Sequence, residues 1–168
     1  MADAGIGALA ERLQGICLGR GLTVGVAESC TGGLLAAAIT DIPGSSGYFL
    51  GGIVSYADSA KIELLGVPAR VVEAHGAVRA QVARAMAEGA RSRFGATLAA
   101  GVTGIAGPDG GTAEKPVGLT YLGIADATGA DVRRRVWTGD REANRLASVR
   151  ELLELLIERA EHLSGAGR

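Results

Sequence analysis

Apolar residues recur along the chain with two kinds of spacing, and the spacing distinguishes helices from strands. Recurrence at every third or fourth position is typical of a helix with one buried face, whereas an unbroken apolar run is typical of a strand buried on both faces. The first pattern predicts helices over residues 4–20, 31–40, 59–65 and 79–94, and a long last helix capped by Asp140. The second predicts strands over residues 22–27, 48–56, 97–102, 119–125 and 132–138.

The order of these segments predicts the fold class. Strands and helices alternate as far as the third strand, which favours parallel strands joined by helices. The last two strands are separated only by a turn that contains Thr128 and Gly129, which predicts a β-hairpin. We therefore expect an α/β protein, a three-layer α/β/α sandwich on a mixed, mostly parallel sheet of about five strands.

Length and composition favour a single globular unit. The 168 residues are enough to bury one substantial core, so we expect one domain over residues 1–168 with a frayed tail at residues 164–168. Aromatic residues make up only 4% of the sequence, so the core must consist mainly of Ala, Val, Leu and Ile.

Charge and cysteine content limit the partners and the compartment. A net charge of −1 gives no electrostatic basis for binding nucleic acid or a membrane surface. No apolar run approaches the roughly 18 residues of a transmembrane helix, and the start lacks the features of a signal peptide. Cys17 and Cys30 have no metal-binding or redox spacing, so we expect a cytoplasmic protein with reduced thiols and no metal.

Polar side chains follow the ends of the first three strands. Ser29 comes after the first strand, Tyr56 and Lys61 after the second, and Thr103 after the third. Because the carboxyl ends of parallel strands meet at the same edge of a sheet, we expect these four side chains to lie at one edge. That edge is the predicted functional site.

Ser29 lies in a short polar turn between an apolar strand and a helix. Unpaired N–H groups at a helix start can hold a phosphate or a developing oxyanion, so a hydroxyl here could act as a nucleophile. An ordinary turn with a good N-cap would have the same composition. Cys30 is a rival nucleophile, because a helix start would lower the pKa of its thiol. The sequence alone leaves the choice between Ser29 and Cys30 open.

Lys61 is the best candidate for a general base. A lysine desolvated at a pocket wall can accept a proton near neutral pH, and Ser–Lys pairs replace Ser–His–Asp triads on some folds. Tyr56 could relay a proton or orient the lysine. Neither His75 nor His162 is placed by the sequence near the turn, and Lys61 could equally be an ordinary surface lysine.

Two further segments have features of a binding site. Residues 101–112 form a long glycine-rich connection, and exposed N–H groups in such a loop can bind anions. Arg141 and Arg145 are four residues apart on one face of the last helix. Arg145 borders the apolar stripe, so it could reach inward and pair with a phosphate or carboxylate.

Four motifs, in this order, resemble those of the CinA C-terminal domain family. They are AESCTGG at 27–33, SYADSAK at 55–61, GVTGIAGPDGG at 101–111 and GDR at 139–141. The similarity extends from about residue 6 to about residue 160. Stand-alone members of this family resemble nicotinamide mononucleotide deamidases, which hydrolyse a carboxamide to nicotinate mononucleotide and ammonia.

The resemblance assigns roles to individual residues. Ser29 resembles the nucleophile, Lys61 the general base and Tyr56 its assistant. Backbone N–H groups near the turn would stabilise the tetrahedral oxyanion. The oxyanion and substrate-binding candidates are Thr31, Gly32, Gly33, Thr103, Gly104, Gly107 and Arg145. The resemblance implies no metal and no cofactor, and the expected ligand is a small-molecule nucleotide.

Two other functions are compatible with the sequence. The chain could be a catalytically silent nucleotide-binding or scaffold module, or an amidase for another small amide. Family members often look oligomeric, so we expect a homo-oligomer. One departure from the family is Arg79, where a serine commonly caps the next helix; this loss should cost about 1 kcal/mol of local stability.

Overall fold

The computed structural model describes residues 3–163 as six α-helices and five β-strands. The predicted fraying of residues 164–168 lies outside this range. The helices are α1 (Ala4–Arg20), α2 (Leu34–Thr40), α3 (Asp58–Leu65), α4 (Ala69–His75), α5 (Ala80–Phe94) and α6 (Arg141–His162). The strands are β1 (Val24–Glu28), β2 (Phe49–Val54), β3 (Leu98–Gly104), β4 (Leu119–Asp126) and β5 (Gly129–Val136), and a 3₁₀ turn spans Ser45–Gly47.

The five strands form one mixed sheet, as predicted. Their order is β2-β1-β3-β4-β5; β1 is parallel to both neighbours, and β4 is antiparallel to β3 and to β5. Strand β2, which follows β1 in the chain, lies on one side of β1, and β3, which comes next, lies on its other side. In open α/β sheets a ligand crevice forms where the connections diverge in this way, outside the carboxyl ends of the strands. The topology therefore favours a site beside β1 and β3.

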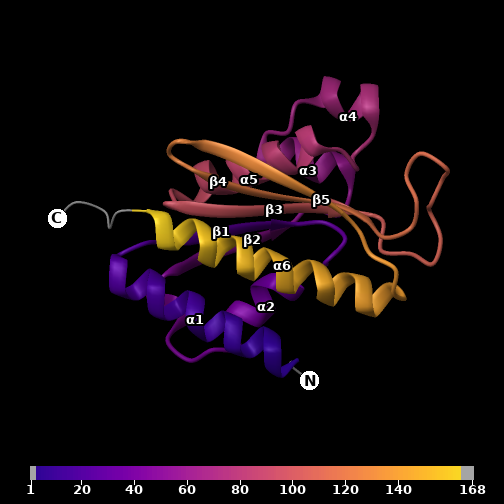
Figure 1. Cartoon of the computed structure of the whole chain (residues 1–168). Coiled ribbons are helices and arrows are strands. Elements are labelled where there is room, and N and C mark those ends of the chain that lie inside the picture. Colours follow the sequence, from indigo (N-terminus) through magenta and orange to yellow (C-terminus); the bar gives the residue numbers. More distant parts are fainter. Residues whose placement is uncertain (1–2, 164–168) are drawn as a thin grey trace.

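Helices cover both faces of the sheet, which confirms the predicted three layers (Figure 1). Helix α5 lies along one face, with α3 and α4 beyond it. On the other face α2 and α6 contact the strands, and α1 packs against both of these helices. The buried hydrophobic residues form two clusters, one on each side of the sheet.

Glycines let the helix layer approach the strands closely. A Cβ atom at Gly101 would lie 2.5 Å from the backbone nitrogen of Ala87, so α5 rests directly on the backbone of β3. In β2, a Cβ at Gly51 would lie 2.5 Å from the ring of Phe94. The last turn of α5 therefore packs closely against the glycines of this strand.

Two features of the elements differ from the predictions. Helix α2 begins at Leu34 rather than at residue 31, because Gly32 and Gly33 adopt left-handed conformations (φ 59° and 101°) that no α-helix contains. Helix α4 was not predicted. It has seven residues and buries only Val72, too little apolar periodicity for the sequence to reveal. Within residues 3–163, no helix has the length and apolar character needed to cross a membrane.

Candidate active site

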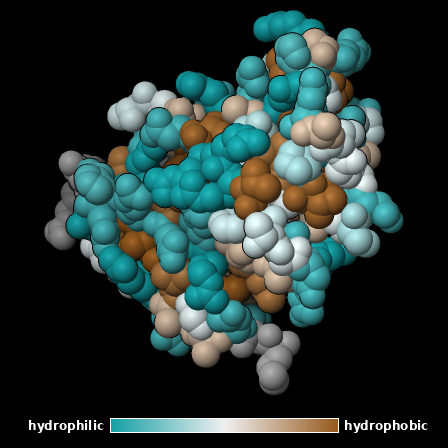
Figure 2. Space-filling model, turned by 45° about the vertical axis from the view of Figure 1, so that its right-hand side comes forward, coloured by the Kyte–Doolittle hydropathy of each residue, from teal (hydrophilic) through white to brown (hydrophobic). Residues whose placement is uncertain are grey.

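The predicted polar side chains do lie at one edge of the sheet. Ser29 follows the last residue of β1, and the register that pairs Ala27 with Gly101 places it level with Thr103 on β3. On the other side of β1, Glu28 pairs with Val54, so the segment that carries Tyr56 leaves the sheet beside the same turn. Figure 2 turns this edge towards the viewer, and hydrophobic residues gather near its centre between hydrophilic ones.

The turn that carries Ser29 is tight and largely buried. Ser29 is 8% exposed, and its carbonyl oxygen accepts a hydrogen bond of 3.0 Å from the N–H of Gly32. The N–H of Gly32 is therefore engaged inside the turn. Among residues 3–163, the N–H groups of Cys30, Thr31 and Gly33 donate to no other residue, and those of Thr31 and Gly33 are candidate donors for an oxyanion.

Glu28 holds the turn from behind, a role that the sequence analysis missed. Its buried carboxylate accepts hydrogen bonds from the N–H groups of Leu35 (2.9 Å) and Ala36 (3.1 Å). The first donors of α2 are thus occupied by a side chain of β1, and they do not face a ligand. An acidic residue at the end of an apolar strand was the available signal for this contact.

Cys30 is poorly suited to be the nucleophile. It is 7% exposed, and burial, reinforced by the negative charge of Glu28, raises the pKa of its thiol to about 11 although Lys61 and Arg145 act in the opposite direction. The sequence analysis expected a helix start to lower this pKa. That expectation is wrong, because the helix begins further along and its first N–H groups bind Glu28.

Lys61 is buried within α3 beside the turn. Its side chain is 1% exposed, and its Nζ donates to the carbonyl oxygens of Ser55 (2.8 Å) and Tyr56 (3.1 Å). The backbone N–H of Ser55 in turn donates to the backbone carbonyl oxygen of Glu28, the residue before Ser29. Burial lowers the pKa of Lys61, while the carboxylate of Asp58, 3.9 Å away, opposes this shift. Burial thus favours the neutral amine that a general base requires.

Tyr56 contributes to the lysine through its backbone rather than its phenol. Its side chain is 60% exposed, and its hydroxyl lies 3.2 Å from Nη2 of Arg141, which donates to it. The same guanidinium donates to the carbonyl oxygen of Gly107 at 2.8 Å. Arg141 therefore joins the segment after β2 to the glycine-rich loop, a link that its place in the GDR motif did not specify.

Arg145 reaches inward, as its place beside the apolar stripe suggested, but its partners are in the Ser29 turn. Its Nε donates to the carbonyl oxygen of Cys30 (3.1 Å) and its Nη2 to that of Thr31 (3.0 Å). The C=O and N–H of a trans peptide unit point in opposite directions, so fixing the oxygen of Cys30 directs the N–H of Thr31 away from Arg145. In the described contacts, Arg145 orients the turn.

The residues of β3 and the following loop are fixed mainly by backbone contacts. The buried hydroxyl of Thr103 donates to the carbonyl oxygen of Ala77 at 3.0 Å. A Cβ at Gly104 would lie 2.8 Å from the carbonyl oxygen of Leu119, and Gly107 has a left-handed φ of 88°. These glycines are needed for the path of the chain whether or not they touch a ligand.

Asn144 is a second residue that the sequence analysis missed. Its side chain is buried, with the residue 2% exposed. Its Nδ2 donates to the carbonyl oxygen of Ala106 in the glycine-rich loop (3.0 Å), and its Oδ1 accepts from the backbone N–H of Gly139, just before α6 (3.0 Å). A buried asparagine on a helix face was the available signal. Its contacts hold the loop against the start of α6.

A cavity of about 460 Å³ lies where this loop meets α6. Its lining residues are Ala106, Pro108, Val117, Gly139, Asp140, Arg141 and Glu142. Arg141 faces both this cavity and Tyr56, so the hollow adjoins the site edge. Within the described residues, no group of three or more His, Cys, Asp or Glu side chains could hold a metal ion.

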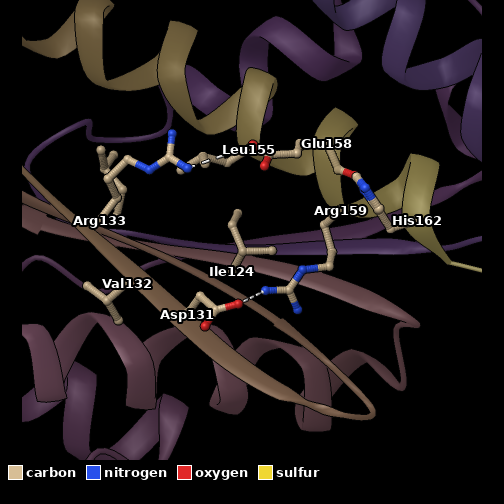
Figure 3. A pocket seen from close by; sticks show the side chains of 9 residues that line it. Ile124, Asp131, Val132, Arg133, Leu155, Glu158, Arg159 and His162 are labelled. Atoms are coloured by element: carbon tan, nitrogen blue, oxygen red, sulfur yellow. Dashed lines mark hydrogen bonds and ion pairs between the residues drawn. The ribbon is translucent and has the colours of Figure 1, made fainter.

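A second cavity, of about 390 Å³, lies between β5 and the end of α6 (Figure 3). Its lining residue Ile124 pairs with Ala100 near the start of β3, whereas the Ser29 turn lies beside the end of that strand. Ion pairs cross the cavity: Arg159 contacts Asp131 and also Asp126 (2.8 Å), and Arg133 lies 3.7 Å from Glu158. Because these charges satisfy one another, this cavity is better explained as a junction between hairpin and helix than as a ligand site.

Comparison with known proteins identifies relatives along most of the chain. The CinA C-terminal domain family matches residues 7–160. A CinA-like protein of Geotalea uraniireducens is 53% identical over 146 residues, covering 87% of this chain and 35% of that protein. A putative competence-damage inducible protein of Moorella thermoacetica is 53% identical over 141 residues, covering 84% and 34%. The chain thus spans about a third of the length of these relatives.

Solved structures have the same fold. The crystal structure of competence/damage inducible protein CihA from Agrobacterium tumefaciens superposes with a TM-score of 0.91 at 44% identity, covering 94% of this chain and 97% of that one. A CinA superfamily protein from Klebsiella pneumoniae superposes with a TM-score of 0.90 at 32% identity, covering 94% and 99%. The fold described above is therefore that of these proteins.

Proposed function

The chain belongs to the CinA C-terminal domain family, and from this membership we propose that it is an amidohydrolase that converts nicotinamide mononucleotide to nicotinate mononucleotide and ammonia. The observation that carries the proposal is the environment of Lys61. A buried primary amine with a lowered pKa lies beside the turn that carries Ser29. A buried lysine at a sheet edge costs stability, and general-base catalysis gives it a use.

The hydrogen bonds of Lys61 suit a base. A neutral amine has two N–H bonds and one lone pair. The carbonyl oxygens of Ser55 and Tyr56 accept the two N–H bonds, so the lone pair is left to take the hydroxyl proton of Ser29. The Oγ of Ser29 then attacks the carboxamide carbon, and the protonated lysine returns the proton to the departing ammonia. Water hydrolyses the resulting ester and restores Ser29.

The turn supplies the electrostatic part of this mechanism. The free N–H groups of Thr31 and Gly33 are the donors for the tetrahedral oxyanion, and each such donor is worth about 3 kcal/mol in serine hydrolases. Arg145 and Glu28 act as positioning residues, because they fix the turn from the α6 side and from β1. Donors held in advance need no reorganisation when negative charge develops.

Ammonia release from nicotinamide mononucleotide, measured without added metal, tests the proposal. We expect turnover by the unaltered chain, its loss in Ser29→Ala, and its retention in Cys30→Ala. The thiol variant is the matched control, because it alters the adjacent residue of the same buried turn. Activity lost in Cys30→Ala but retained in Ser29→Ala would assign the nucleophile to the cysteine instead.

The two other functions give different results in the same assay. An amidase for another small amide would release ammonia from simple amides rather than from the pyridine nucleotide. A catalytically silent nucleotide-binding module would bind the nucleotide and release no ammonia. The burial and lowered pKa of Lys61 favour catalysis over the silent module, since nucleotide binding alone does not require a buried amine.

A further inference from the structure

Two cations converge on one backbone oxygen in a region that the mechanism does not use. Nζ of Lys115 donates to the carbonyl oxygen of His75 at 2.7 Å, and Nε of Arg79 donates to the same atom at 3.2 Å. Lys115 lies just after the glycine-rich segment, in the connection between β3 and β4, and Arg79 is the N-cap of α5. Both side chains are half-buried.

This cation pair lies next to the proposed catalytic edge. Thr103 is level with Ser29 on the adjacent strand, and adjacent strands are about 4.8 Å apart. The hydroxyl of Thr103 binds the carbonyl oxygen of Ala77, which lies in the chain between His75 and Arg79. The segment that carries Arg79 and the His75 carbonyl therefore crosses the end of β3 beside the nucleophile, and Lys115 reaches it from the connection after β3.

The positive charge of the pair is not neutralised by the protein. Among residues 3–163, no carboxylate lies within 4.0 Å of Arg79 or Lys115. Burial, together with the nearby charge of Arg79, lowers the pKa of Lys115, and the neighbouring Glu114 opposes this only in part. Two like charges held together without a partner favour the binding of an anion.

The pair also retains unused hydrogen-bond donors. An ammonium has three N–H donors and a guanidinium five, and the oxygen of His75 accepts one from each. Arg79 forms no side-chain capping bond at the start of α5, a helix of 15 residues, so the first N–H groups there are uncapped as well. Arg145, the other candidate for an anion, is engaged with the Ser29 turn.

We propose that Arg79 and Lys115 bind the phosphate of a phosphorylated substrate, so that the site selects a mononucleotide over the corresponding nucleoside. This inference rests on the proposed function, since it names the part of the substrate that lies away from the carboxamide. The competing explanation is that both cations only cap the C-terminal carbonyls of α4, where positive charge is also favoured. That explanation predicts no discrimination between nucleotide and nucleoside.

Substrate selectivity tests the inference directly. The ratio of kcat/KM for nicotinamide mononucleotide to that for nicotinamide riboside is measured in the unaltered chain, Arg79→Ser and Lys115→Gln. We expect each variant to lower kcat/KM for the nucleotide about tenfold or more, the effect of one charged hydrogen bond, and to leave the nucleoside unchanged. Arg79→Ser supplies an N-capping hydroxyl to α5, so folding is preserved.

The control is Arg84→Gln, which removes an exposed arginine of the same helix that pairs with Glu88. It should leave the ratio unchanged. If Arg79→Ser and Lys115→Gln also leave the ratio unchanged, or lower kcat/KM equally for both substrates, the assignment of the phosphate site is wrong. An enzyme that hydrolyses both substrates equally well would retain the amidohydrolase proposal and refute this inference.

A binding measurement separates the inference from the proposed reaction. Inorganic phosphate is titrated calorimetrically into the same four proteins, whether or not they release ammonia. Binding that both cation variants weaken about tenfold, and Arg84→Gln does not, supports the phosphate site even in a chain without amidase activity. Absence of phosphate binding in the unaltered chain, or binding insensitive to both variants, would refute it.

Discussion

Lys61 and Cys30 share one buried environment, and this environment affects the reactivity of the two side chains in opposite ways. Removal from water favours the neutral form of each group. The neutral lysine is a base, whereas the neutral thiol is a weak nucleophile. Burial lowers the pKa of Lys61 and raises that of Cys30 to about 11. The same desolvation thus supports a serine–lysine pair and disfavours the adjacent cysteine.

The charge of Asp58 should control the pH dependence of the reaction. Its carboxylate, 3.9 Å from Nζ, raises the pKa of Lys61, so Asp58→Asn lowers that pKa further. Because the base must be deprotonated, kcat/KM rises with pH through the pKa of Lys61, and this rise should move to lower pH in Asp58→Asn. A pH–rate profile of ammonia release at low ionic strength measures the shift, since salt screens an exposed carboxylate.

Asp58→Glu keeps the charge and serves as the control, with a profile close to that of the unaltered chain. A rise that moves to higher pH in Asp58→Asn would show that the titrating group is not Lys61. The profile then belongs to another residue of the site, and the role of the lysine as base would be wrong.

The sequence predicts where the chemically active residues lie, but it does not predict which side chains hold them in place. Strand order was sufficient to place Ser29, Lys61 and Thr103 at one edge, because parallel strands fix where their ends meet. The contacts of Arg145 with the Ser29 turn join residues more than a hundred positions apart, and local periodicity contains no information on such pairs. Glu28 binds residues only seven and eight positions away, but this contact escaped prediction because it depends on the left-handed glycines of the turn, Gly32 and Gly33, which shift the start of α2.

At the scale of elements, the strands and long helices were predictable and the short segments were not. The spacing of apolar residues predicted α5 almost to the residue, and the cap at Asp140 predicted where α6 begins; each helix buries a stripe several turns long. The start of α2 was placed too early, because composition does not reveal that two glycines adopt left-handed conformations. Helix α4 has a single buried residue and no periodicity to detect.

The hairpin of β4 and β5 is joined to α6 by ion pairs at the edge of the sheet opposite the site. Arg159 of α6 pairs with Asp126 at the end of β4 (2.8 Å) and with Asp131 of β5, and Arg135 lies 2.6 Å from Glu151 (Figure 3 shows part of this junction). Asp126 is nearly inaccessible and also accepts two hydrogen bonds from Thr128. This junction fixes the end of the hairpin to the last helix.

Asp126 should make the stability of the chain depend on pH in the acid range. Burial alone would raise the pKa of Asp126, but hydrogen bonds from Thr128 and the charge of Arg159 outweigh it and lower the pKa from 3.8 to about 2. A carboxylate with a depressed pKa stabilises the fold above its unfolded pKa, and this stabilisation is lost as pH falls through about 2. The shift corresponds to about 2 kcal/mol.

We therefore expect Asp126→Asn to unfold more easily than the unaltered chain by about 2 kcal/mol at pH 7, and by much less near pH 2. Urea unfolding across that range measures the difference. Asp131→Asn is the control, because the side chain of Asp131 is 86% exposed and its pairing with the same arginine is screened by solvent. An equal loss of stability at both pH values in Asp126→Asn would contradict the linkage.

At the scale of the whole molecule, the two edges of the sheet differ in how their charged side chains are paired. At one edge, chain ends of β1, β2 and β3 present a serine, a buried lysine and unpaired cations. At the other, oppositely charged side chains pair with one another across the hairpin and α6. In the Ser29 turn the buried Oγ1 of Thr31 has no hydrogen-bond partner among the described residues, and a ligand that binds at this edge should stabilise the entire fold.

Thermal unfolding of Ser29→Ala with nicotinate mononucleotide, the proposed product, tests this expectation. A ligand present at about 100 times its Kd stabilises the folded chain by about 2.7 kcal/mol, which raises Tm by about 5–10 °C for a protein of this size. The serine variant prevents turnover, so the shift reports binding alone. Nicotinic acid riboside, which lacks the phosphate, should give a smaller shift because it cannot engage Arg79 and Lys115. A full shift in Ser29→Ala, together with no ammonia release by the unaltered chain, would identify a silent binding module; no shift with the nucleotide would refute nucleotide binding at this edge.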